Sequence, residues 1–371
     1  MSQWQTKQLG EFITFHRGYD LPKKQMSGGP YPVVGSNGII GWHNQSTTAA
    51  PGITIGRSGN TGKPFLCKTE SWSHNTTLFI ESYRNCEPLF VYYFLQSLQL
   101  NKHASGSAVP TLNRNHIHKL EVTLPDLDSQ KKIACILSLI DGKIELNNRI
   151  NDYLTELALA MYKDFCSNAP GKMGTLADLI ELRKDSIKPG KRPELPYMPI
   201  DIIPIKSMGV VEFKSNSEAK SSLQLFQCDD IVIGAMRVYF HRVILAPCEG
   251  ITRNTCFVLR PKTPLLREYA LLTCFQPEAI EYANARSKGS TMPYAVWEDS
   301  FETYPVLIPE ILELEEFSKR LAPIINQLRD TYKVNSRLAE MRDTLLPKFM
   351  SGEIDVSKID ITQLNNHLSG C

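Results

Sequence analysis

The chain has 371 residues, of which 42% are hydrophobic and 22% are charged, and its formal net charge is +2. This balance excludes a disordered chain, and the length suits two or three globular domains. The nine cysteines include no Cys-x-x-Cys pair, which argues for reduced thiols and against a zinc site. Neither a long apolar run nor a signal peptide at Met1–Gln5 is present, so we expect a cytoplasmic protein.

Short β-type runs separated by turns fill residues 1–125. The segments Ile53–Ile55, Thr77–Ile80 and His118–Leu124 predict strands. Between them, Pro88–Leu100 predicts a helix that begins at a proline. We therefore expect a mixed α/β domain in this first globular segment.

A long helix is expected over residues 126–171. Apolar and amide side chains recur there at alternating spacings of four and three, which is the pattern of a heptad seam. The seam positions are Ile133, Leu137, Ile140, Ile144, Asn147, Asn151, Leu154, Ala158, Met161 and Phe165.

Residues 172–309 repeat the pattern of the first globular segment. Asp230–Ile233, Cys256–Leu259 and Thr303–Ile308 predict strands, again with a helix between them, at Leu265–Phe275. We expect a second mixed α/β domain. The shared motifs lie 178 to 184 residues apart and occur in the same order: Ile55-Gly56 with Ile233-Gly234, Asn75-Thr76 with Asn254-Thr255, Gly106–Pro110 with Gly289–Pro293, and Leu124-Pro125 with Ile308-Pro309.

The heptad seam also returns, in residues 310–350, before a tail at 351–371. Since neither helix can bury such a stripe alone, we expect the two to pair as an antiparallel coiled coil with pseudo-twofold symmetry. The alternative is that each helix lies on its own globular core. Pro323 is expected to interrupt the second helix. The second seam consists of Phe317, Leu321, Ile324, Leu328, Thr331, Asn335, Leu338, Arg342, Leu345 and Phe349.

The centre of both seams is polar. In an antiparallel pair Asn147 would face Asn335, and Asn151 would face Thr331. A buried amide layer weakens a coil and fixes its register, so we expect these residues to set the alignment of the helices. Alternatively, the helices splay here and the amides meet water or a partner.

Charge is distributed unevenly along the chain. Residues 1–125 hold 11 Lys and Arg against 6 Asp and Glu, and residues 172–309 hold 17 against 16. The helical segments are acidic, with 5 against 7 in residues 126–171 and 8 against 10 in residues 310–371. This favours globular parts that meet phosphate and helices that meet protein, although an ordinary solvated surface gives a similar pattern.

Motifs for catalysis are missing. The sequence has no Gly-x-Gly-x-x-Gly, no nuclease cluster and no histidine pair at metal spacing. The segment Gly56–Lys63 fails as a phosphate loop, because Arg57 replaces the first glycine and Pro64 the magnesium-binding hydroxyl. We predict no catalytic residue, no metal and no directly bound cofactor.

Polar side chains next to the repeated positions are the better candidates for function. They differ between the copies while the small residues around them agree, which favours two different reading surfaces on one scaffold. Such side chains contact base edges and phosphates, although a glycine turn can also serve only to reverse the chain. The expected DNA-binding residues are Arg57, Ser58, Asn60, Lys63, His74, Asn75, Ser107, Asn113 and Arg114 in the first copy, and Arg237, Tyr239, His241, Arg242, Arg253, Asn254, Lys288, Ser290 and Thr291 in the second.

The chain resembles the specificity subunit of type I restriction-modification systems over nearly its whole length. The motifs that carry the resemblance are Gly106-Ser107 with Pro110, Leu124-Pro125, Gln130–Ile133, Ile140–Ile144 and Leu345–Ile354. The resemblance implies two target-recognition domains, at 1–125 and 172–309, each reading one half of a bipartite asymmetric site in double-stranded DNA.

The resemblance also implies partners. The helices would set the half-site spacing and bind two adenine-N6 methyltransferase subunits, which use AdoMet and support a restriction and translocase subunit that uses ATP and Mg²⁺. The chain itself would be non-catalytic. Two other readings remain, a non-catalytic coiled-coil scaffold of duplicated modules and a self-sufficient DNA-modifying enzyme with cryptic motifs.

Overall fold

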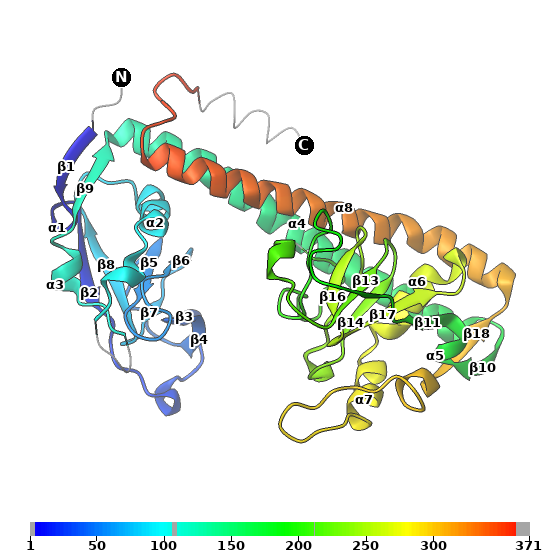
Figure 1. Cartoon of the computed structure of the whole chain (residues 1–371). Coiled ribbons are helices and arrows are strands. Elements are labelled where there is room, and N and C mark those ends of the chain that lie inside the picture. The colour runs from blue at the N-terminus through cyan, green and yellow to red at the C-terminus, as the bar shows by residue number, and fades with distance from the viewer. Residues whose placement is uncertain (1–3, 106–109, 211, 361–371) are drawn as a thin grey trace. The chain divides into compact units, whose positions relative to one another are not determined.

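The computed structural model describes residues 4–105, 110–210 and 212–360. It divides into two compact units (Figure 1). Unit 1 comprises Met1–Gly142 with Ala339–Cys371, and unit 2 comprises Lys143–Leu338.

Unit 1 is built on a four-stranded antiparallel sheet with the order β2-β8-β5-β6. A three-stranded sheet, β4-β3-β7, and a two-stranded pair, β1-β9, complete it. The strands are β1 (Trp4–Gln8), β2 (Ile13–Arg17), β3 (Tyr31–Gly35), β4 (Gly38–His43), β5 (Gly52–Gly56), β6 (Pro64–Cys67), β7 (Trp72–Ser73), β8 (Thr77–Tyr83) and β9 (Glu121–Pro125). The helices are α1 (Leu9–Phe12), α2 (Pro88–Ser97) and α3 (Arg114–Ile117), with 3-10 turns η1 (Lys23–Gln25) and η2 (Leu100–His103).

Unit 2 repeats the four-stranded sheet and the two-stranded pair of unit 1, whereas its three-stranded sheet is paired differently. Its four-stranded antiparallel sheet has the order β11-β17-β14-β15, beside a three-stranded sheet, β12-β13-β16, and the pair β10-β18. The strands are β10 (Gly171–Thr175), β11 (Ile180–Arg183), β12 (Ser186–Ile187), β13 (Leu223–Phe226), β14 (Ile231–Gly234), β15 (Val243–Leu245), β16 (Gly250–Arg253), β17 (Cys256–Pro261) and β18 (Pro305–Pro309). The helices are α5 (Leu176–Leu179), α6 (Arg267–Cys274) and α7 (Pro277–Ala285), with 3-10 turns η3 (Asn216–Glu218), η4 (Val238–Phe240), η5 (Pro264–Leu266) and η6 (Phe301–Thr303).

The predicted strands are present, with three shortened at their start. β14 begins at Ile231, one residue after the predicted start. β9 begins at Glu121, because His118 follows α3 and its Nε2 accepts a hydrogen bond from the backbone N–H of Phe15 at 2.9 Å. β18 begins at Pro305, because the preceding residues form η6. The helix α7 was not predicted from the sequence.

Two long helices, α4 (Leu127–Asn168) and α8 (Ile311–Met350), follow the two modules. The prediction that Pro323 interrupts the second helix is wrong, since α8 is continuous through it. Pro323 is exposed, so water can satisfy the carbonyl that loses its N–H partner. No seam position of either helix is exposed, as the heptad spacing predicts.

Contacts between α4 and α8 occur within each unit. In unit 1 the start of α4 and the end of α8 share one core, through Ile133, Leu137 and Phe349. In unit 2 the end of α4 meets the start of α8, where the rings of Phe165 and Phe317 stack at 4.2 Å between centroids. Each unit therefore joins opposite ends of the two helices.

The segment after α8 completes the core of unit 1. Val356 is buried in that core, and Lys132 Nζ donates to the carbonyl oxygen of Ser357 at 2.9 Å. Gly352 has φ +75° and lies against the Trp4 ring, where a Cβ would come within 2.9 Å. A glycine is therefore required at this turn.

Candidate nucleic-acid interface

Three loops of unit 1 meet at one end of β5. The backbone N–H of Arg57 donates to the carbonyl of Thr76 at 2.8 Å, and that of Leu112 donates to the carbonyl of Arg57 at 2.8 Å. Ser105 and Thr111 exchange two backbone hydrogen bonds, of 3.0 and 2.9 Å. These bonds bring the loops that carry most of the first-copy candidates into one cluster.

The same bonds recur in unit 2. The N–H of Ala235 donates to Thr255 at 2.9 Å, and that of Ala295 donates to Ala235 at 2.8 Å. Lys288 and Tyr294 exchange two bonds of 2.9 Å each. The two modules therefore share one loop scaffold, on which different side chains stand.

The first-copy candidates differ in exposure. Asn60, Lys63, Asn113 and Arg114 are exposed, whereas Arg57, Ser58, His74 and Asn75 are partly buried. The Asn75 amide donates to Asp20, and Asn113 caps α3 by accepting from the N–H of Asn115 at 2.9 Å. Ser107 lies outside the described residues.

Most second-copy candidates lie at the surface. Tyr239, Arg253, Asn254, Lys288, Ser290 and Thr291 are exposed, and Arg237 is partly buried with φ 51°.

His241 and Arg242 have structural roles instead. His241 is 6% exposed, and its Nε2 donates to the carbonyl of Phe275 at 3.0 Å, an arrangement that does not favour the predicted DNA contact. Burial also lowers the pKa of its imidazole, which keeps the ring neutral. Arg242 Nη1 donates to the carbonyls of Ile200 at 2.7 Å, Asp201 at 3.1 Å and Ile203, and so ties a neighbouring segment to β15.

The exposed aromatic residues next to the first cluster were not predicted from the sequence. Tyr19 is exposed, its N–H donates to Ser73 at 2.8 Å, and its ring meets the edge of Trp72 at 6.2 Å. Trp42 is also exposed, and the ring of His43 contacts Trp72 at 5.0 Å. Aromatic and basic residues interleaved in this region were the available signal.

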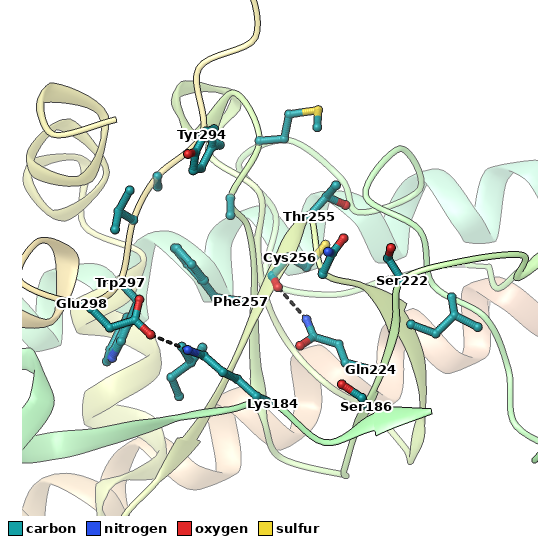
Figure 2. Close-up of a pocket in the computed structure, with 17 residues that line it drawn as sticks. Lys184, Ser186, Ser222, Gln224, Thr255, Cys256, Phe257, Tyr294, Trp297 and Glu298 are labelled. Carbon is teal, nitrogen blue, oxygen red and sulfur yellow. Dashed lines mark hydrogen bonds and ion pairs between the residues drawn. The ribbon is translucent and has the colours of Figure 1, made fainter. Parts of the chain in front are cut away.

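A cleft opens beside the corresponding cluster of unit 2 (Figure 2). Its volume is about 640 Å³, within the usual range for ligand sites. Figure 2 shows Tyr294, Phe257 and Trp297 on one side of the view, with Thr255, Gln224 and Ser186 on the other. Lys184 and Glu298 form an ion pair among the lining residues, and this hydrogen bond lowers the pKa of the Glu298 carboxyl.

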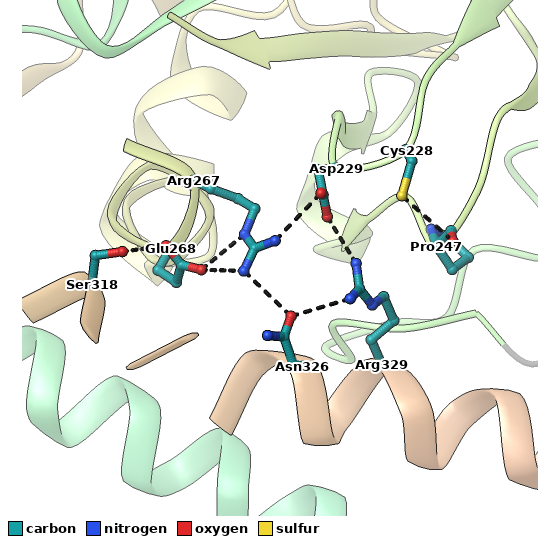
Figure 3. Close-up of polar contacts among 8 residues, drawn as sticks. All are labelled: Cys228, Asp229, Pro247, Arg267, Glu268, Ser318, Asn326 and Arg329. Atoms are coloured by element: carbon teal, nitrogen blue, oxygen red, sulfur yellow. Dashed lines mark hydrogen bonds and ion pairs between the residues drawn. The ribbon is translucent and has the colours of Figure 1, made fainter. Parts of the chain in front are cut away.

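A network of polar contacts fastens the second module to α8 (Figure 3). Asp229 accepts from Arg267 at 3.3 Å and from Arg329 at 3.0 Å. The buried Glu268 accepts from Arg267, and also from the hydroxyl of Ser318 on α8 at 2.9 Å. The module is thus held to the helix by charge-assisted bonds that fix its orientation within unit 2.

The polar centre of the seams is only partly as expected. Asn147 Nδ2 donates to Asn335 Oδ1 at 2.7 Å, which confirms that this pair faces each other. Thr331 turns back to its own helix, with its hydroxyl donating to the Gln327 carbonyl at 2.7 Å. Asn151 is 1% exposed, and neither atom of its amide has a hydrogen-bond partner in the described part of the chain, so its expected pairing with Thr331 is not made.

Neither a metal-binding cluster nor a membrane-spanning helix is found among residues 4–105, 110–210 and 212–360. No group of three or more His, Cys, Asp or Glu side chains there could hold a metal ion. None of the helices there is long and apolar enough to cross a membrane.

Residues 1–156 match the family model of the type I restriction modification DNA specificity domain. The MjaIX specificity subunit of Methanocaldococcus jannaschii is 21% identical over 303 residues, covering 73% of this chain and 70% of that protein. The HindI specificity subunit of Haemophilus influenzae is 21% identical over 328 residues, covering 66% and 71%.

A solved structure shares the fold. The crystal structure of the S subunit of a type I restriction-modification system from M. genitalium has a TM-score of 0.65 at 15% identity, and covers 94% of this chain and 96% of that one. By its sequence matches and its fold, the chain is similar to the specificity subunits of type I restriction-modification systems, with residues 1–156 matching the DNA specificity domain of that family.

Proposed function

We propose that the chain reads a bipartite, asymmetric DNA sequence, with residues 1–125 binding one half-site and residues 172–309 the other. The observation that carries the proposal is the repeated backbone bonding around Arg57 and Ala235, on which unlike polar side chains stand in the two modules. One scaffold with two side-chain sets suits two different sequences. The neighbouring aromatic residues add surface for contacts with sugar and base.

The helices would recruit two adenine-N6 methyltransferase subunits. Leu146, Ile150, Tyr153 and Leu157 lie on α4 at spacings of four, three and four, and all are exposed, Tyr153 to 63%. An exposed apolar stripe of this kind suits a partner helix. The equivalent positions on α8 are Asp330, Val334, Arg337 and Met341, so the two methyltransferase contacts would be unequal.

The chemistry would reside in these partners. The methyltransferases would supply AdoMet, and a restriction and translocase subunit bound through them would supply ATP and Mg²⁺. This chain would remain non-catalytic and would bind none of these cofactors itself.

Half-site spacing would be set by α4 and α8, paired as an antiparallel coiled coil with pseudo-twofold symmetry. The hydrogen bond between Asn147 and Asn335 supports this proposal, because a buried amide pair is satisfied in only one register. Register would then determine how far apart the half-sites lie.

The test is to co-purify the chain with its methyltransferase and map the methylated adenines. We expect one bipartite sequence, and replacement of residues 1–125 by those of a relative should change only one half of it. A swap that alters both halves or neither contradicts the two-module proposal.

Two controls separate the other functions. A chain that reads DNA should bind it with an affinity that decreases steeply as the salt concentration rises, whereas a protein scaffold would not bind DNA. Methylation or cleavage by the purified chain with AdoMet or Mg²⁺ alone would instead support a self-sufficient enzyme.

A further inference from the structure

The cleft of unit 2 lies where the second module would meet DNA. It is lined by five separate segments, and two of them carry the predicted contact Asn254 and the residue Tyr294 that closes the Gly289–Pro293 loop. Tyr294 is 49% exposed, so its ring is available to a ligand. The cleft is therefore part of the candidate interface, and its shape has to be explained by what binds there.

Its lining suits a flat, neutral ring with polar edges. Tyr294, Phe257 and Trp297 supply aromatic surface, and Met236 supplies a polarisable apolar contact. The only ionised groups among the lining residues are Lys184 and Glu298, which neutralise each other. Such a lining disfavours a phosphate and favours a nucleobase.

A hydrogen-bond acceptor is fixed in the wall opposite the aromatic residues. Gln224 is 7% exposed, and its Nε2 donates to the carbonyls of Cys256 at 2.6 Å and Arg253 at 3.2 Å. Because the nitrogen is held in this way, the side-chain oxygen has a set orientation. The exposed amide of Asn254 and the hydroxyl of Ser222 add donors and acceptors to the same lining.

We propose that this cleft takes up one unstacked base of the second half-site. A stacked base pair offers only its edge, whereas a concave site of about 640 Å³ with aromatic walls accommodates a whole ring. The base that loses its partner when a methyltransferase extrudes the adenine is the expected occupant, since its pairing is already broken. Lys184 lines the cleft with 67% of its side chain exposed, so it can exchange Glu298 for the phosphate of that nucleotide.

This inference rests on the proposed function, and is tested with the full chain bound to its methyltransferase. Duplexes that carry a single mismatch are scanned across both half-sites. Unpairing a base costs less at a mismatch. The duplex that is mismatched at one particular position of the second half-site should therefore bind about tenfold more tightly than the matched duplex, which corresponds to about 1.4 kcal/mol. An abasic site at that position should abolish the gain.

Variants then locate the effect. Tyr294→Ala and Phe257→Leu should remove the gain, so that each variant binds the mismatched and the matched duplex equally tightly. Phe240→Ala, which changes an exposed aromatic residue of the same module outside the cleft lining and outside the predicted DNA contacts, is the matched control and should retain the gain.

Each outcome is decisive. Specific binding to the matched duplex without mismatch enhancement in the second half-site overturns the cleft proposal and leaves the proposed function standing. Enhancement that persists in both cleft variants also overturns it. Absence of sequence-specific binding to any DNA overturns the proposed function, and the cleft proposal with it.

Discussion

Units 1 and 2 attach their modules to the long helices through different chemistry at equivalent positions. In unit 1 the hydroxyl of Tyr93 donates to Asp141 at 2.7 Å, and Arg342 donates to the same carboxylate at 2.9 Å. The counterparts of Asp141 and Arg342, 184 residues away along the chain, are Ile325 and Ala158, both buried in the apolar core of unit 2.

This difference shows that a duplicated backbone does not require duplicated side chains at its junctions. The counterpart of Tyr93 in unit 2 is Tyr269, whose hydroxyl donates to the carbonyl of Leu307 at 2.7 Å, and Ile325 stands at the position equivalent to Asp141. Unit 2 therefore depends on close packing at this point. Unit 1 depends on the geometry of three polar groups.

The apolar junction should be the more sensitive to loss of volume. Phe317 stacks on Phe165 and also contacts Tyr162 and Tyr269. We expect Phe317→Ala to lower the free energy of unfolding of unit 2 by about 3–5 kcal/mol, through lost burial and a residual cavity. Urea unfolding followed by circular dichroism measures this. An effect as small as that of the exposed-site control Val334→Ala would contradict tight packing here.

The polar junction should respond to loss of one partner. Arg342→Ala removes the guanidinium that bonds to Asp141, and we expect a loss of about 1–3 kcal/mol, since both side chains are partly exposed to water. The double variant Asp141→Ala/Arg342→Ala should recover part of this loss. Additive losses in urea unfolding would show that the two groups are not coupled.

The seam centre offers a comparison between a satisfied and an unsatisfied amide. Asn151→Leu removes two buried groups that have no partner in the described chain, and should raise the free energy of unfolding by about 1 kcal/mol. Asn147→Leu should lower it by a similar amount, because Asn335 loses its donor. Thermal unfolding of both variants checks this, and a loss of stability in Asn151→Leu would indicate a bound water at that site.

Among the described residues, each unit holds one histidine whose pKa is lowered, His118 in unit 1 and His241 in unit 2, in both cases mainly by burial. These histidines are therefore protonated at a higher pH in the unfolded chain than in the folded chain. The stability due to neutral imidazole is complete above about pH 6.5 and is lost as the pH falls through the folded pKa values.

This should be the smallest effect, because His118 is partly exposed and water screens it. The urea concentration at the unfolding midpoint should decrease as the pH is lowered from about 6.5 to about 5. In His241→Asn, this decrease should be smaller for unit 2. A midpoint that stays constant over this range in the parent chain would argue against neutral histidines.

The sequence predicted those features that depend on local periodicity. The 4-3 spacing identified buried positions along both helices, because a long helix presents one face to its neighbour throughout. The effect of Pro323 could not be predicted in this way, since it depends on which side of α8 faces water.

Features that depend on loop conformation were harder to predict. His241 points inward because it and Arg237 both adopt left-handed backbone conformations, which the residue types do not indicate. The cleft could not be anticipated either, because its lining comes from five segments between Leu182 and Glu298. The repeated motifs at Asn254 and Gly289–Pro293 pointed to two of those five segments, the ones that contain Asn254 and Tyr294.

The packing of Val356 and Trp4 has a consequence for synthesis of the chain. Unit 2 is continuous, and all of its residues have been translated once Leu338 is added, whereas unit 1 also needs Ala339 onward. The first 142 residues must therefore wait for more than 200 others before their core can close. On the ribosome, the second module is then expected to complete its folding before the first, in reverse of the order in which the two emerge.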